Sequence, residues 1–329
     1  MGTGASYSDG VPLQKDIIPT ILNPEPEEFK ESKLRKFVSV FIEDNFSYSR
    51  DDEIYPTLEN VFSYLNHFIE NEVALSKIYS LEKLIQIKEG LIKLIYYITS
   101  RSTRSPLTQY EIEKNGRDKD SIYSFFWEKA AKTSRNFSVI TTNYDNQIDD
   151  AFDKWMYAKH GLIKLIKIHG SLNWKFCKCC SETLLTPWNS HMNLETGELT
   201  RFDPRWFDEG ENMTLCPRDG YPLSTMIVPP SYSKSLRHPV IQNLMYEAQK
   251  EIRVAKKVAF VGYSFPDADI HIKAIFNKNL RDDSRLYVVN PSLNKISKEA
   301  YRGLSKNITF IEKDFLSAIE DGLIEELIA

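Results

Sequence analysis

The chain has 329 residues, enough for one large domain, or a domain with a sizeable insertion, around a buried core. Its apolar fraction of 42% and charged fraction of 27% are ordinary for a globular protein, which argues against disorder and fibrous repeats. The net charge of −4 gives no basic excess, so we expect no direct nucleic-acid binding.

The apolar stretches and the cysteines indicate the compartment. The most apolar stretch, residues 91–98, contains Lys93 and is far shorter than the ~20 residues that cross a bilayer. The first residues are glycine-rich rather than basic and then apolar, and the crowding of cysteines at 177–180 is unlike a secreted disulfide framework. We therefore expect a cytoplasmic protein without a secretory leader or membrane contact.

The first part of the chain is a glycine-rich turn followed by a helical block. Residues 1–6 read Met-Gly-Thr-Gly-Ala-Ser. Apolar residues then recur at three- and four-residue spacing, which predicts helices over 34–42, 58–69 and 81–97 within a block that ends near residue 131. The block carries no chemical motif, so its apolar residues are interpreted as core.

From residue 137 the pattern changes to short apolar runs that alternate with helical patterns. Strands are predicted at 137–142, 162–168, 257–262, 285–290 and 308–311, and helices at 146–156, 269–280, near 295–301 and at the end of the chain. Residues 177–220 are polar and irregular, which predicts a small module. The alternation indicates an α/β fold with a parallel sheet covered on both faces.

The glycine turn has three interpretations. Gly2 and Gly4 let backbone amides approach a phosphate at a helix start, although the third glycine of a dinucleotide fingerprint is missing. Met-Gly-x-x-x-Ser also fits an N-myristoylation acceptor, and a frayed terminus is the simplest alternative.

The position of this turn in the sequence adds an expectation about the sheet. A phosphate-binding glycine loop normally follows an inner strand, and here the loop begins at Gly2. We therefore expect a sheet with a gap, a disordered glycine loop, and a natural chain that starts upstream with a short apolar run.

Polar residues follow two predicted strands. Thr142, Asn143 and Asp145 end the first strand, where open α/β sheets place ligands. The Asn143 amide can hold a water or a ribose hydroxyl, and an Asx turn that caps the next helix, with Asp145, is the alternative. His169 ends the second strand beside Gly170 and can serve as a general base, although a lone histidine is more often structural.

Two further strand ends carry small or hydrogen-bonding residues. Gly262 and Ser264 follow one strand, and Asn290 ends another. Each alone is an ordinary strand-to-helix turn; together they suit phosphate and ribose contacts.

In their order along the chain, these motifs resemble the sirtuin family. The match runs Gly-Thr-Gly-Ala-Ser, Thr-Thr-Asn-Tyr-Asp, Ile-His-Gly-Ser, a cysteine module, Gly-Tyr-Ser and Val-Asn-Pro; it leaves the helical block unmatched. The chain looks most similar to bacterial sirtuin-like proteins of phage defence, in which the domain hydrolyses NAD. The resemblance implies a Rossmann-like parallel sheet and a catalytic pair, Asn143 and His169. The residues that it assigns to NAD contacts are Gly2, Gly4, Ala5, Ser6, Thr142, Asp145, Gly262, Ser264 and Asn290.

Departures from the family decide which reaction is expected. Leu13 and Gln14 stand where a deacylase has part of its Pro-Asp-Phe-Arg motif, and Thr142 replaces the Gln that precedes the catalytic Asn. The peptide-pairing strand would fall at 227–230, where two prolines cannot donate ladder hydrogen bonds. We therefore expect water as the acceptor and an NAD glycohydrolase; a deacylase or ADP-ribosyltransferase, and a non-enzymatic NAD or ADP-ribose sensor, are the alternatives.

The cysteines outline a zinc ribbon whose last ligand is an aspartate. Cys177, Cys180, Cys216 and Asp219 form the expected zinc set, and Cys179 is an alternative to Asp219. A ribbon without its fourth thiolate is also compatible with a metal-free module.

These observations give a domain division and a set of partners. We expect a sirtuin-like NAD-binding domain at 1–24 and 132–329, with the cysteine module at 175–222, and a helical insertion at 25–131 that serves as a lid or an assembly surface. An NAD hydrolase that is always active would drain its host, so we expect control by a homo-oligomer, with a partner ATPase or a phage-sensing subunit as a further candidate.

Overall fold

The computed structural model describes residues 1–25, 27–102, 121–132, 137–149, 151, 163–185, 190–192, 199–201, 215–234 and 236–328. The chain divides into two compact units: unit 1 is Met1–Val11, Asn115–Gly170 and Ser235–Ala329, and unit 2 is Pro12–Lys114 and Ser171–Lys234. None of the described helices is long and apolar enough to cross a membrane.

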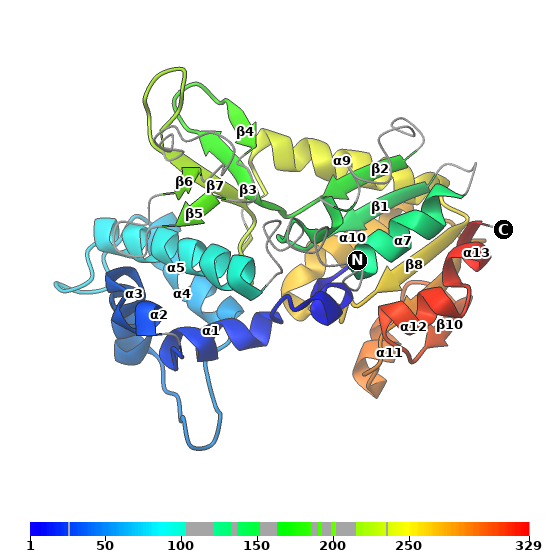
Figure 1. Ribbon diagram of the computed structural model, residues 1–329, viewed down its shortest axis with the longest axis horizontal. Helices are drawn as coiled ribbons and strands as arrows, with labels where there is room; N and C mark the ends of the chain where they lie inside the picture. The colour runs from blue at the N-terminus through cyan, green and yellow to red at the C-terminus, as the bar shows by residue number, and fades with distance from the viewer. Residues whose placement is uncertain are drawn as a thin grey trace, which may run out of the picture. The chain divides into compact units, whose positions relative to one another are not determined.

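Unit 1 is an α/β unit (Figure 1). Its strands are β1 (Phe137–Thr141), β2 (Ile163–Lys167), β8 (Lys257–Val261), β9 (Arg285–Val289) and β10 (Ile308–Ile311). Its helices are the short 3₁₀ turns η1 (Thr3–Ala5), η2 (Tyr7–Asp9) and η4 (Asp267–Asp269), with α7 (Ile122–Ala131), α9 (Pro239–Val254), α10 (Ile270–Asn279), α11 (Lys295–Arg302), α12 (Phe315–Glu320) and α13 (Leu323–Ile328). The predicted α/β class is confirmed.

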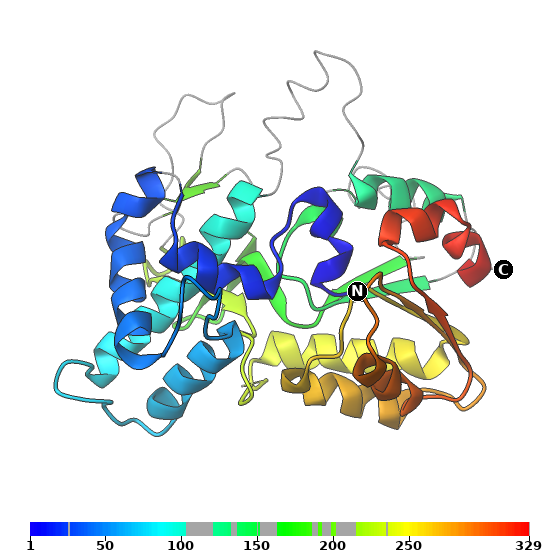
Figure 2. The same ribbon diagram turned by 90° about the horizontal axis from the view of Figure 1, so that it is seen from below.

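All strand pairs of unit 1 that the structure describes are parallel. β1 pairs with β2 from Phe137↔Ile163 to Thr141↔Lys167, and β9 lies between β8 and β10. In β9 the last four residues are all buried, as expected for strands covered on both faces. Figure 2 shows α9 and α10 on one side of these strands and α7, α12 and α13 on the other. Helices therefore cover both faces of these strands (Figure 2).

Unit 1 contains two parallel half-sheets, β1-β2 and β8-β9-β10, and among the described residues backbone hydrogen bonds from Met1 and Gly2 link them. Among the described strands, β1 pairs with β2 alone and β8 with β9 alone. The Met1 amino group donates to the Ile140 carbonyl, and the Gly2 amide donates to the Val261 carbonyl at 3.0 Å. No strand in the part of the chain that the structure describes pairs with both β1 and β8, which agrees with the expected gap in the sheet. The expected disorder of the glycine loop is wrong, because hydrogen bonds to both half-sheets hold the loop in a defined turn.

Unit 2 combines helices with short antiparallel strands. Its helices are α1 (Gln14–Leu22), α2 (Glu27–Glu31), α3 (Lys33–Asn45), α4 (Leu58–Glu70) and α5 (Leu81–Ser102), and its strands are β3 (Gly170–Cys177), β4 (Thr183–Leu185), β5 (Ser190–Met192), β6 (Leu199–Arg201) and β7 (Leu223–Ile227). The three helices predicted over 34–42, 58–69 and 81–97 are confirmed as α3, α4 and α5. Strand β3 lies between β4 and β7. Residues 171–234, which include the predicted cysteine module at 175–222, belong to the same unit as the helices, whereas we expected the module to be part of the sheet domain.

Candidate functional site

The glycine loop is packed backbone against backbone on Gly262. Gly262 has φ 57°, and a β-carbon there would fall 2.1 Å from the Ala5 nitrogen. A β-carbon at Gly2 would lie 2.8 Å from the Gly262 carbonyl oxygen. Only glycine fits this close approach, so steric demand alone accounts for Gly2 and Gly262. The backbone amides of Gly2, Gly4, Ala5 and Ser6 all donate to carbonyls inside the protein.

Ser6 connects the loop to the residues after β1. Its side chain is fully buried, and its hydroxyl donates to Asp145 Oδ2 at 3.1 Å. The same oxygen lies 2.7 Å from the Tyr123 hydroxyl and accepts from Asn143 Nδ2 at 3.0 Å. One donated and two accepted bonds satisfy a hydroxyl completely. The Ser6 hydroxyl thus links Tyr123, Asn143 and Asp145 in one buried hydrogen-bond network.

The side-chain amide of Asn143 makes hydrogen bonds through its nitrogen, whereas its oxygen makes none. Besides Ser6, its Nδ2 donates to the Gly2 carbonyl at 3.1 Å, and its backbone amide donates to Thr141 Oγ1. Because Nδ2 faces an acceptor that cannot donate, the orientation of the amide is settled. Its carbonyl oxygen, Oδ1, is buried and has no hydrogen-bond partner. A buried acceptor of this kind is a binding position for a donor such as a water or hydroxyl.

Asp145 is an internal carboxylate at the start of the next helical turn. Burial raises its pKa, while the charge of Lys167 acts in the opposite direction. Its Oδ1 accepts from the Gln147 amide at 3.1 Å, which is the Asx-turn geometry given above as the alternative for this residue. Lys167 donates to the Asp145 carbonyl and to Asp149 Oδ2, both at 2.6 Å. These hydrogen bonds join residues 145–149, which follow Asn143, to Lys167 at the end of β2.

His169 lies at the same sheet edge as Asn143. Asn143 comes two residues after Thr141, and His169 comes two residues after Lys167. Because Thr141 pairs with Lys167 in the parallel ladder, the register places Asn143 and His169 side by side. His169 is buried, and its Nε2 lies 2.8 Å from Nε2 of His271 on α10. At that distance one ring nitrogen donates and the other accepts.

His271 is a site residue that the sequence analysis missed. Two positions before it, Asp269 is buried and its Oδ2 accepts from the Tyr263 hydroxyl at 2.7 Å. Donor atoms of His169, Asp269 and His271 lie within 4.8 Å of one another, a grouping that can hold a metal ion. The Asp-x-His spacing just after Gly262 was the signal available in the sequence.

The remaining predicted NAD contacts are spread along the carboxyl ends of the strands. The Thr142 amide donates to the Met1 carbonyl, which ties β1 to the first residue. Ser264 is exposed beyond β8, and Asn290 Oδ1 accepts from the Ser292 amide at 2.9 Å beyond β9. All of them lie in unit 1, as do Asn143 and His169.

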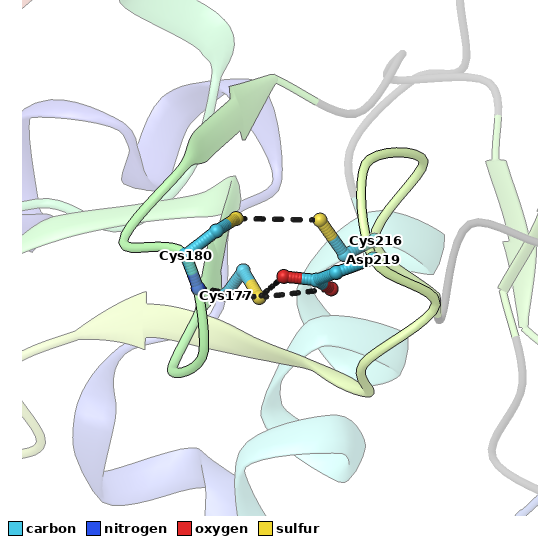
Figure 3. A group of neighbouring side chains, drawn as sticks. All are labelled: Cys177, Cys180, Cys216 and Asp219. Carbon is cyan, nitrogen blue, oxygen red and sulfur yellow. Dashed lines mark hydrogen bonds between the residues drawn. The ribbon is translucent and has the colours of Figure 1, made fainter.

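The cysteine residues of unit 2 form a four-residue cluster (Figure 3). The Cys180 and Cys216 sulfurs are 3.6 Å apart, and both Asp219 carboxylate oxygens lie 3.5 Å from the Cys177 sulfur. Tetrahedral zinc with Zn–S bonds of ~2.3 Å separates its ligands by about 3.8 Å. A hydrogen bond from the Tyr221 amide lowers the pKa of Asp219 to about 2, so this ligand is ionised at neutral pH. The residues fit a zinc site with Asp219 as the fourth ligand; Cys179 is exposed and outside the group.

The chain matches no protein-family model and no curated protein. Solved structures that are similar to it are Sir2 homologues. One, a Sir2 homologue in complex with NAD, has 12% identity and a TM-score of 0.47, covering 99% of this chain and 86% of that one. A variant bound to ADP-ribose has 13% identity and a TM-score of 0.48, covering 99% and 89%. Sir2 bound to an acetylated peptide has 14% identity and a TM-score of 0.42, covering 100% and 92%.

Proposed function

We propose that unit 1 binds NAD and hydrolyses the bond between nicotinamide and ribose. The products are nicotinamide, ADP-ribose and a proton. The observation that carries the proposal is the Asn143 side chain, whose carbonyl oxygen is buried without a partner although the rest of the amide is fixed. It lies at the carboxyl edge of a parallel sheet, where α/β proteins bind nucleotides.

The roles of the two catalytic side chains follow from their chemistry. Asn143 Oδ1 accepts a hydrogen bond from the attacking water and so orients a lone pair of that water toward C1′ of the ribose. The C1′–nitrogen bond breaks as the new C1′–oxygen bond forms, and nicotinamide leaves with the bonding electron pair. His169 takes the proton of the water, directly or through a ribose hydroxyl.

His271 fits the role of a partner that completes the base. The 2.8 Å contact between the two Nε2 atoms lets the proton received by His169 be shared with His271. Positioning both rings in one fixed pair also lowers the entropy cost of proton transfer. His271 is therefore proposed as a positioning residue for His169.

Water is the proposed acceptor, rather than an acyl group on a peptide. Residues Val228, Pro229 and Pro230 follow β7, and neither proline carries an amide hydrogen for a peptide ladder. A protein deacylase would need such a ladder for its substrate. The distinguishing test is product analysis: hydrolysis gives free ADP-ribose, and acyl transfer gives an O-acyl derivative only when an acylated peptide is present.

The biological setting that we propose is antiphage defence in the cytoplasm. An uncontrolled NAD hydrolase would harm its own host, so activity would be switched by self-assembly or by a partner ATPase or phage-sensing subunit. The test compares nicotinamide release per protomer across a concentration series that spans the change in oligomeric state. A rate per protomer that is constant through that change would refute switching by self-assembly.

A further inference from the structure

Three side chains of the kinds that bind metals meet at the carboxyl edge of the unit 1 sheet. His169 follows β2, and His271, near the start of α10, lies 102 residues further along the chain. Asp269 comes two residues before His271, and one donor atom of each of the three side chains lies within 4.8 Å of the other two. Imidazole and carboxylate groups in this two-to-one ratio are a common ligand set for first-row transition-metal ions. The fold therefore assembles such a set from two distant segments.

The contact between the two histidines has nearly the spacing of two ligands on one ion. The Nε2 atoms of His169 and His271 are 2.8 Å apart. Metal–nitrogen bonds of ~2.0–2.1 Å place two ligand atoms about 2.9 Å apart at a bond angle of 90° and about 3.3 Å apart at the tetrahedral angle. His271 is half-buried, so its ring has room for the small rotation that this range requires. One ion can thus replace the hydrogen that joins the two rings.

The burial pattern of the segment around Asp269 is the reverse of what the hydrophobic effect favours. Asp269 is 5% exposed, whereas the neighbouring Ile270 is 72% exposed. Burial of a carboxylate is costly unless hydrogen bonds or a cation compensate its charge, and a buried polar group is more informative than an exposed apolar one. Here an apolar contact is lost and a carboxylate is placed beside two imidazoles. A cation bound among them stabilises this arrangement.

Tyr263 orients Asp269 toward the same point. Its hydroxyl donates to Asp269 Oδ2 at 2.7 Å, and both side chains are buried. An ionised carboxylate has two oxygens and about four lone-pair positions, so Asp269 can keep this hydrogen bond while it binds an ion. Hydrogen bonds from neighbouring groups to metal ligands fix the orientation of the ligands and raise metal affinity. Tyr263 is therefore a supporting residue of the site.

We propose that His169, Asp269 and His271 bind one divalent transition-metal ion, such as Zn²⁺, at a site separate from the cysteine cluster of unit 2. Imidazole nitrogens favour zinc and similar ions, whereas Mg²⁺ and Ca²⁺ prefer oxygen ligands. The ion takes the Nε2 lone pair of His169, and the neutral ring then carries its proton on Nδ1. No lone pair of His169 is left to accept a proton. This consequence rests on the proposed function: the bound ion switches NAD hydrolysis off.

Zinc titration followed by calorimetry tests the site without NAD. Wild type is compared with His271→Ala and with Asp269→Asn, which loses the charge but keeps an oxygen for the Tyr263 hydroxyl. The exposed His67→Ala is the control. The cysteine cluster is the same in all these proteins, so differences between them report the histidine site. Thermal unfolding checks that each variant is folded.

We expect His271→Ala to bind one zinc per chain fewer than wild type and His67→Ala. Asp269→Asn and Tyr263→Phe should bind that zinc roughly 10–100-fold more weakly. Mg²⁺ in excess should not displace it. Equal zinc stoichiometry and affinity in wild type and His271→Ala would overturn the proposal, and so would equal affinity of the site for Mg²⁺ and Zn²⁺.

Nicotinamide release across the same zinc series tests the consequence for activity. The zinc concentration that halves the rate should match the Kd of the site, and in Tyr263→Phe it should rise by the same factor as the Kd. An undiminished rate in zinc-saturated wild type would refute inhibition by the ion. A protein that binds this zinc but cleaves no NAD at any zinc concentration would contradict the proposed function and still confirm the metal site.

Discussion

Replacing Asn143 by alanine separates the structural role of its amide from its proposed catalytic role. The variant loses the bonds from Nδ2 to the Gly2 carbonyl and to Ser6 Oγ, and it loses the partnerless Oδ1. Both acceptors keep other partners: the Ala5 amide donates to Gly2, and the Tyr123 hydroxyl remains beside Ser6. The expected cost is therefore two net hydrogen bonds, about 1–3 kcal/mol in the free energy of unfolding.

The catalytic cost should be larger than this structural cost. Loss of a group that positions the reacting water lowers kcat by roughly 10²–10³-fold, as for other single polar groups at a reacting centre. The assay is nicotinamide release followed by chromatography, with thermal unfolding measured on the same preparations. The rate should fall by this factor at a temperature where the variant is still fully folded.

Asn66 offers a matched control for this substitution. It is also buried, its Nδ2 donates two bonds at 3.2 Å, to Ser231 Oγ and the Ser233 carbonyl, and its Oδ1 is likewise without a partner. Asn66→Ala should lose similar stability and keep its activity. Equal activity losses in the two variants, or an Asn143→Ala variant with wild-type activity, would refute the reasoning.

The other predictions concern the histidine pair, the metal cluster and the first residue. His169→Ala should lower kcat by about 10²–10⁴-fold, and His271→Ala should lower kcat by less and change its pH profile. The control is His67→Ala, because His67 is exposed. An unchanged rate in His169→Ala would rule out His169 as the general base. Protein purified without chelator should contain one zinc per chain, and Asp219→Ala should lose it at lower chelator concentrations than wild type; a content near zero would mean a metal-free module. The folded pKa of the Met1 amino group, about 5, lies below its ordinary value of 8.0, so folding is favoured by the neutral form and the free energy of unfolding should rise between pH 5 and 8, by up to about 4 kcal/mol. Urea unfolding at both pH values checks this, and N-terminally acetylated protein should lack this contribution; equal pH dependence with and without the acetyl group would contradict it.

Much of unit 1 could be predicted from local sequence patterns. Runs such as Phe137–Thr141 and Arg285–Val289 are apolar and β-branched, and they alternate with helical patterns, so the α/β class follows from periodicity. The position of Asn143 and His169 at one sheet edge followed from the same reasoning, because parallel strands bring their carboxyl ends together. Their roles in catalysis stay predictions.

Other features depend on packing that no local pattern encodes. His271 lies 102 residues from its partner His169, and only the placement of α10 beside the sheet edge brings the rings together. Strand β3 (Gly170–Cys177) was missed because its polar and aromatic residues lack a clear alternation. Helix α1 contains Pro19, which interrupts the helical pattern in the sequence. The internal hydrogen bonds of the Gly2, Gly4, Ala5 and Ser6 amides also required coordinates, since those of Gly2 and Gly4 reach Val261 and Gly262, far along the chain.

The most direct test of the proposed function is hydrolysis of NAD by the purified protein in ¹⁸O-labelled water. We expect nicotinamide and ADP-ribose in equal amounts, with one ¹⁸O atom at C1′ of the released ADP-ribose. His169→Ala and Asn143→Ala should each lower the rate at which both products form by roughly 100-fold or more. The series should cover a wide range of protein concentrations, because the proposed control by self-assembly makes the rate per protomer depend on concentration. NAD that stays intact over the whole series, or ADP-ribose that appears only as an acylated or protein-bound product, would contradict the account.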